Sequence, residues 1–128
     1  MKQGVTDAIE ELKKAFPSST VTYNEDGQGG AHVFVESVDI GERFVPSATW
    51  MGGHITAHHP YADIYPVFID ATVCRVDGQE FNEAVTHGHS FADRPAIQIS
   101  RRNNRIQNNP QTAVAKFMKI IDFLEKMQ

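Results

Sequence analysis

The chain has 128 residues, of which 41% are hydrophobic and 22% are charged. This length predicts one domain spanning residues 1–128, and this composition predicts an ordered hydrophobic core rather than a disordered chain. The formal net charge is −4. We therefore expect neither nucleic acid nor an anionic membrane surface as a general partner, because both select for a basic surplus.

Cysteine content and hydropathy indicate the cellular compartment. One cysteine cannot form an intramolecular disulfide, which is typical of proteins in a reducing cytoplasm. The first residues lack the apolar core of a signal peptide, and no apolar run approaches the roughly 20 residues that span a bilayer. The expectation is a soluble cytoplasmic protein.

Two segments have helical periodicity. Residues 5–16 carry apolar side chains at helical spacing, and Pro17 ends the pattern. A second helix is predicted after Asn109, an N-cap residue, and Pro110, which suits the first helical position. The apolar stripe of this second helix consists of Val114, Phe117, Met118, Ile121 and Leu124.

Extended segments lie between the two helices. Strands are predicted near residues 20–24, 31–38, 43–50, 54–59, 67–73 and 95–100. Residues 75–92 are polar, contain two glycines and are expected to form a long connection, which in compact domains is usually functional. This order predicts an α+β fold: an N-terminal helix, an antiparallel meander sheet of about four strands, a long loop and a C-terminal helix.

The middle of the chain carries Tyr61 and Pro66, five positions apart, then an apolar strand and the segment Ala96-Ile97-Gln98-Ile99. This order resembles the ubiquitin-conjugating enzymes and their RWD relatives. Tyr61 and Pro66 match the first and last residues of the family's Tyr-Pro-x-x-Pro-Pro turn, and an apolar strand, 67–69, follows them. Ala96-Ile97-Gln98-Ile99 is similar to the family's Cys-Leu-Asp-Ile. The family's His-Pro-Asn motif is absent, and neither Ala96 nor Ile97 can form a thioester.

This resemblance implies a divergent prokaryotic domain without the usual catalytic cysteine. Its role would be to bind a ubiquitin-like protein or an activating enzyme in a bacterial ubiquitin-like modification pathway. Whether the chain is an enzyme stays open, because the family's thiol could have moved to Cys74. The order Cys74, Glu80 or Glu83, His87, His89 is also similar to small predicted Cys-Glu-His-His metal-binding domains of bacterial ubiquitin-like operons.

The same residues predict two kinds of chemistry. Zinc accepts thiolate, imidazole and carboxylate ligands, so Cys74, His87, His89 and a glutamate, Glu83 or Glu80, would complete a four-coordinate site. In an extended backbone, His87 and His89 would point the same way toward one ligand. Alternatively, Cys74 is a nucleophile activated by a loop histidine, or a small buried hydrophobic residue in a chain whose His-Gly-His segment is only a polar loop.

A second histidine cluster contains His54, His58 and His59. If residues 54–59 form a strand, His54 and His58 share one face. A metal site there would need a carboxylate from a neighbouring strand, such as Glu36. The alternative is a solvated sheet face.

Ser100-Arg101-Arg102-Asn103-Asn104-Arg105 is the basic segment of the chain. It could bind phosphate or an acidic tail of a partner, or it could be a solvated turn that balances nearby acids. Trp50 is expected to pack in the core or at its rim, and would anchor a partner only if it were exposed.

Overall fold

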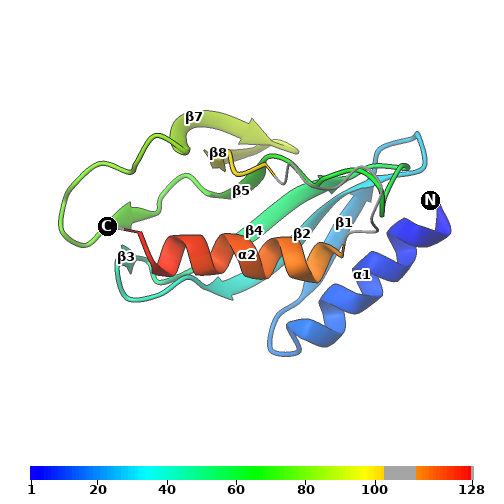
Figure 1. Cartoon of the computed structure of the whole chain (residues 1–128), viewed down its shortest axis with the longest axis horizontal. Helices are drawn as coiled ribbons and strands as arrows, with labels where there is room; N and C mark the ends of the chain where they lie inside the picture. The colour runs from blue at the N-terminus through cyan, green and yellow to red at the C-terminus, as the bar shows by residue number, and fades with distance from the viewer. Residues whose placement is uncertain (103–111, 128) are drawn as a thin grey trace.

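The computed structural model describes residues 1–102 and 112–127. In chain order its elements are α1 (Gln3–Ala15), β1 (Val21–Glu25), β2 (Ala31–Asp39), β3 (Phe44–Val45), β4 (Ala48–Ile55), β5 (Val67–Asp70), β6 (Cys74–Arg75), β7 (Val85–Phe91), β8 (Arg94–Ile99) and α2 (Ala113–Glu125). Figure 1 shows both helices in front of the same side of the sheet. The predicted α+β fold, with a helix at each end of an antiparallel sheet, is confirmed.

The main sheet has six strands in the order β1-β2-β4-β5-β8-β7, and every neighbouring pair is antiparallel. Strands β3 and β6 form a separate two-stranded ribbon, in which Val45 lies opposite Cys74. The predicted meander corresponds to β1, β2, β4 and β5, and the β7–β8 hairpin extends it beyond the expected four strands.

Residues 75–92 were predicted to be one long connection, and this prediction is wrong. They contain the edge strand β7, which is buried only at its ends, at Val85 and Phe91. The strand lacks an alternating apolar pattern because its middle residues face solvent at the edge of the sheet.

Other element boundaries also differ from the predictions. The strand predicted over 43–50 divides into β3 and β4 at Pro46, while the one predicted over 54–59 stops at Ile55 and is followed by turns. Helix α2 begins at Ala113, where the Thr112 hydroxyl accepts a hydrogen bond from the backbone N–H of Ala115 at 3.0 Å. The predicted cap, 109–110, lies outside the described residues.

The hydrophobic core lies between the helices and the sheet. Alternate side chains of a strand point to opposite faces, so one set from each central strand meets the apolar stripes of the helices. The fully buried members of this core include Ile9 and Leu12 of α1, Val33 and Val35 of β2, Met51 of β4, Ile69 of β5, Ile97 and Ile99 of β8, and Phe117 and Ile120 of α2.

The opposite face of the sheet carries a second, aromatic cluster. It consists of Phe34, Phe68, Phe91 and Ala96, with Trp50 half-buried at its rim. The Phe91 ring stacks on Phe68 at 4.7 Å between centroids and lies 5.3 Å from Phe34. Because β4, β5 and β8 separate β7 from β2 in the sheet, the contact with Phe34 requires the sheet to curl.

An ion pair between β8 and β2 stabilises the curled sheet. Arg94 of β8 donates two hydrogen bonds to the carboxylate of Glu36 of β2, at 2.7 and 2.9 Å. The Arg94 guanidinium also lies 3.8 Å above the centroid of the Phe34 ring, and Thr22 of β1 donates a hydrogen bond to Glu36 at 2.6 Å. The β7–β8 hairpin is therefore held across the aromatic face by paired charges and stacked rings.

Gly52 of β4 leaves the space that the Phe91 ring occupies. A Cβ at this position would lie 2.8 Å from Cε2 of Phe91 and 3.0 Å from the carbonyl oxygen of Val33. We expect Gly52→Ala to reduce the free energy of unfolding by about 1–3 kcal/mol, because overpacking forces the ring or the strand to shift. Urea unfolding of the variant beside the wild type measures this change.

Phe91→Leu supplies the control for this prediction. The cost of Gly52→Ala should be smaller in a Phe91→Leu background, because the ring that causes the clash is gone. Equal costs in the two backgrounds would show that the clash with Phe91 does not determine the effect.

Candidate functional site: a basic pocket beside the C-terminal helix

The structure places the predicted thiol on the surface. Cys74 is exposed on β6, and its Sγ donates a hydrogen bond to the carbonyl oxygen of Val45 at 3.6 Å. The alternative of a small buried hydrophobic residue is therefore wrong. The strand predicted over 67–73 ends at Asp70. Cys74 therefore does not belong to the end of that strand but to the two-stranded ribbon that β6 forms with β3.

His87 and His89 do not point the same way, contrary to the prediction. A β-bulge separates Thr86, which lies opposite Gln98, from His89, which lies opposite Ala96. Gly88 inside the bulge has a φ of +82°. His89 shares a 2.9 Å hydrogen bond with the Thr86 hydroxyl, whereas the His87 ring lies against Phe81 at 5.4 Å between centroids.

The glutamates proposed as the fourth ligand, Glu80 and Glu83, are both exposed in the segment before β7. Within residues 1–102 and 112–127, no three His, Cys, Asp or Glu side chains are grouped so that they could hold a metal ion. The proposed zinc site on Cys74, Glu83, His87 and His89 stays a prediction.

The second histidine cluster is divided by the turn that ends β4. His54 contacts Asp26 through its Nε2, 2.7 Å from Oδ2, and stacks on His32 with 4.3 Å between ring centroids. His58 is exposed, whereas His59 is buried and its Nδ1 has no partner among the described residues. The predicted carboxylate, Glu36, is committed to Arg94.

Sequence reasoning missed His32 and Asp26, which together fix the His54 ring. Asp26 Oδ1 also accepts backbone hydrogen bonds from Gln28 at 2.7 Å and Gly30 at 3.0 Å. The hydrogen bond from His54, followed by that from Gln28, lowers the pKa of Asp26 to about 2. Burial, with a smaller effect of nearby His54, lowers the pKa of His32. The arrangement fixes the orientation of the His54 imidazole. His32 lies two residues before Phe34 in a predicted strand, and this spacing was the sequence signal that could have placed both side chains on one face of the sheet.

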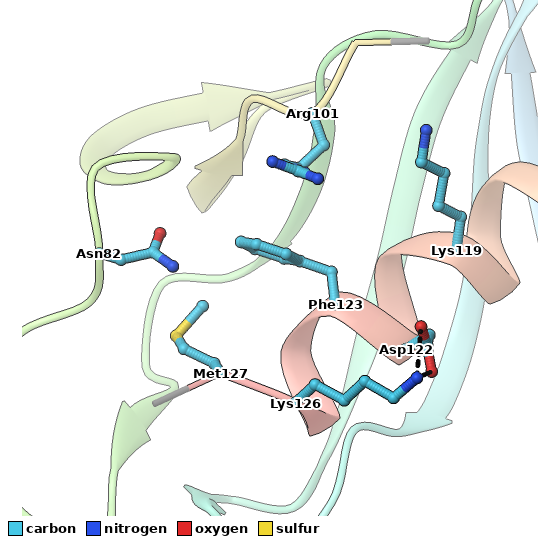
Figure 2. A pocket seen from close by; sticks show the side chains of 7 residues that line it. All are labelled: Asn82, Arg101, Lys119, Asp122, Phe123, Lys126 and Met127. Atoms are coloured by element: carbon cyan, nitrogen blue, oxygen red, sulfur yellow. Dashed lines mark hydrogen bonds and ion pairs between the residues drawn. The ribbon is translucent and has the colours of Figure 1, made fainter.

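A pocket of about 360 Å³ lies where the C-terminal half of α2 faces the segments on either side of the β7–β8 hairpin (Figure 2). Its volume lies within the range typical of small-molecule sites. The lining residues are Asn82, Arg101, Lys119, Asp122, Phe123, Lys126 and Met127. We call this feature the basic pocket, because it gathers three cationic side chains and one carboxylate.

The cations of the basic pocket differ in their partners. The Lys126 Nζ lies 3.0 Å from Oδ1 of Asp122, so this pair is neutral overall. The Arg101 guanidinium lies 4.8 Å from the centroid of the Phe123 ring. In the described part of the chain, neither Arg101 nor Lys119 has a carboxylate within ion-pairing distance. Two positive charges therefore remain available to a ligand.

A buried lysine positions Arg101. The Lys116 side chain is 5% exposed, and its Nζ donates to both carboxylate oxygens of Asp63, at 3.0 and 3.2 Å, and to the backbone carbonyl of Arg101 at 2.6 Å. Burial lowers the pKa of Lys116, and the hydrogen bond to Asp63 opposes this effect. The ammonium thus ties α2 to the chain that leaves β8.

The predicted basic segment contributes only part of this pocket. Arg101 lines it, whereas Arg102 lies over the ring of Tyr65 at 4.2 Å, and 103–105 lie outside the described residues. Sequence reasoning missed Lys119, Phe123 and Lys126. Their helical spacing within the predicted C-terminal helix was the signal that could have placed them on one face.

Comparisons with protein-family models, with curated proteins and with solved structures give no match to this chain. In the described residues, neither helix has the length and apolar character needed to cross a membrane. The resemblance to ubiquitin-conjugating enzymes stays a prediction.

The stacked histidines predict a pH dependence of stability. The pKa of His32 is lowered from 6.5 in the folded protein, so the unfolded chain binds more protons below that pH. The free energy of unfolding should therefore be constant above pH 6.5 and should decrease as the pH falls toward the pKa of His32 in the folded protein. We expect His32→Phe, which keeps a ring against His54, to flatten this decrease between about pH 7 and 5.

Urea unfolding across this pH range measures the effect, and His58→Phe in the exposed turn is the control for loss of an imidazole. Part of the slope should remain in His32→Phe, since burial also lowers the pKa of His59. An unchanged slope in the His32 variant would contradict the prediction.

Proposed function

We propose that the protein is a binding module that recognises an anionic group in the basic pocket. The observation that carries this proposal is the pair of cations, Arg101 and Lys119, which have no carboxylate partner among residues 1–102 and 112–127 and lie beside the half-buried Phe123 ring. Arginine suits this role because its planar guanidinium can stack on an aromatic ring while its N–H groups bind a carboxylate or phosphate.

The local charge contrasts with that of the whole chain. The pocket residues carry three positive charges and one negative charge, whereas the formal net charge of the protein is −4. A positive site on an acidic protein gives directionality, since an anionic ligand is attracted to the pocket and repelled from most of the surface.

The composition of the lining favours binding over nucleophilic catalysis. The pocket is lined by Asn, Arg, Lys, Asp, Phe and Met side chains, and none of these seven residues is a serine, threonine, cysteine or histidine. The lining therefore lacks the hydroxyl, thiol and imidazole groups of serine- and cysteine-type mechanisms, and the lysine and aspartate side chains that it contains suit ion pairing as well as catalysis.

This proposal is compatible with the partner expected from the sequence resemblance. A ubiquitin-like protein or an activating enzyme could present an acidic segment or a terminal carboxylate to the pocket. A zinc site and a Cys74-dependent transferase are alternatives that depend on Cys74, Glu83, His87 and His89. None of these residues lines the basic pocket, so the alternatives can be tested separately.

The pocket proposal predicts weak, specific binding of simple anions. Acetate or inorganic phosphate, titrated into isotope-labelled protein, should shift the NMR signals of Asn82, Arg101 and Phe123. Arg101→Ala should weaken this binding about tenfold, since a hydrogen bond to a charged group contributes about 1.5–3 kcal/mol before solvent screening. Lys119→Ala should have a smaller effect in the same direction.

Lys14→Ala is the matched control, because Lys14 is also an exposed helical lysine and lies on α1. It removes one positive charge without touching the pocket. Equal losses in Lys119→Ala and Lys14→Ala would mean that net charge, rather than the pocket, determines binding, and the proposal would fail.

The thiol alternatives have their own test. If Cys74 holds zinc, elemental analysis of the purified protein should give one zinc per chain, and Cys74→Ala should lose it. If Cys74 is a transferase nucleophile, the wild type should form a reducible adduct with a ubiquitin-like protein that Cys74→Ala cannot form. Absence of both metal and adduct would remove both alternatives and leave the basic pocket.

A further inference from the structure

We infer that the ligand of the basic pocket is a carboxylate attached to an apolar group, rather than a phosphate; this inference rests on the anion-binding function proposed above. The inference follows from three features of the pocket: its apolar floor, its position at the C-terminal half of α2, and the balance of positive and negative charges among its lining residues.

The floor of the pocket is apolar. Phe123 is half-buried and Met127 is 4% exposed. Figure 2 shows the Phe123 ring reaching from α2 toward Asn82, with the Met127 side chain beneath it. An anion bound beside these groups gains little from them, whereas an attached apolar group would bury surface against both.

The position on α2 disfavours a phosphate. The pocket residues of this helix are at 119–123 of an element that ends at Glu125, so they belong to its C-terminal half. Helices favour phosphate at the N-terminus, where free N–H groups and the positive end of the dipole meet the ligand. At the C-terminus the dipole is negative and opposes a doubly charged anion more strongly than a singly charged one.

The charge balance points in the same direction. Asp122 neutralises Lys126 at 3.0 Å, which leaves Arg101 and Lys119 to bind the ligand. A carboxylate needs one guanidinium and carries one charge, so it meets less repulsion from Asp122 and has a lower desolvation cost beside Phe123 than a phosphate dianion.

Four probes test the ligand class. Three of them share a phenyl group on a three-carbon chain, namely 3-phenylpropionate, 3-phenylpropyl phosphate and the neutral 3-phenylpropanol, and the fourth, acetate, lacks the tail. Calorimetry or NMR titration gives their affinities for the wild-type chain. We expect 3-phenylpropionate to bind about tenfold more tightly than acetate, because its ring is buried, and about tenfold more tightly than 3-phenylpropanol, because its carboxylate makes a charge-assisted contact. It should also bind more tightly than the phosphate ester.

Phe123→Leu tests the role of the floor while retaining an apolar side chain against the core. It should reduce the ratio of the affinities for 3-phenylpropionate and acetate about threefold, because the phenyl tail loses its contact with the ring. Loss of the contact between Arg101 and the Phe123 ring affects both carboxylates alike, so the ratio isolates the tail. The NMR spectrum of the variant establishes that it is folded.

The outcomes separate the two proposals. Tighter binding of the phosphate ester, or no gain from the phenyl tail, would overturn the carboxylate inference and leave the anion-binding function intact. Failure of all three anions to bind would overturn both. Equal affinity of 3-phenylpropanol and 3-phenylpropionate would show that the pocket is only an apolar hollow, which also contradicts both.

Discussion

The buried ammonium of Lys116 is the contact on which the arrangement of the basic pocket depends. A lysine in this position is costly unless each of its three donors is satisfied. Here Asp63 receives two of its hydrogen bonds and the carbonyl of Arg101 the third. One side chain thereby joins three parts of the chain: helix α2, the segment between β4 and β5, and the exit from β8. The Arg101 side chain reaches Phe123 because its backbone is held at this junction.

The two faces of the sheet are stabilised in different ways. The helix side is an ordinary apolar core, in which alternate strand residues meet two amphipathic helices. No helix in the described part of the chain covers the other side, and the β7–β8 hairpin curls over it instead. The absence of a side chain at Gly52 leaves space that the Phe91 ring occupies, and the ion pair between Arg94 and Glu36 holds the hairpin against this face. Trp50 stays half-buried at the rim of this cluster, as the sequence predicted.

The predictable parts of the fold are those with strong periodicity. Both helices and strands β1, β2, β5 and β8 follow from local patterns, whereas β4 was predicted as parts of two separate strands. Strand β7 does not, because an edge strand with a bulge at Gly88 has no alternation to detect. The candidate site was even harder to predict from the sequence. Arg101 was singled out as basic, but its approach to Phe123 depends on tertiary contacts that no local pattern encodes.

Two arginines illustrate what distinguishes a structural charge from one available to a ligand. Arg94 and Arg101 both lie against a phenylalanine ring, and composition alone cannot separate them. Arg94 forms a bidentate pair with the two oxygens of Glu36, so a ligand carboxylate would have to displace this pair, which holds the β7–β8 hairpin across the aromatic face. Arg101 has only the ring of Phe123 as a side-chain partner in the described part of the chain, and a ligand carboxylate could join it without breaking an existing ion pair. The cost of binding is therefore lower at Arg101, and this difference, rather than the number of cations, places the candidate site at α2 instead of on the aromatic face.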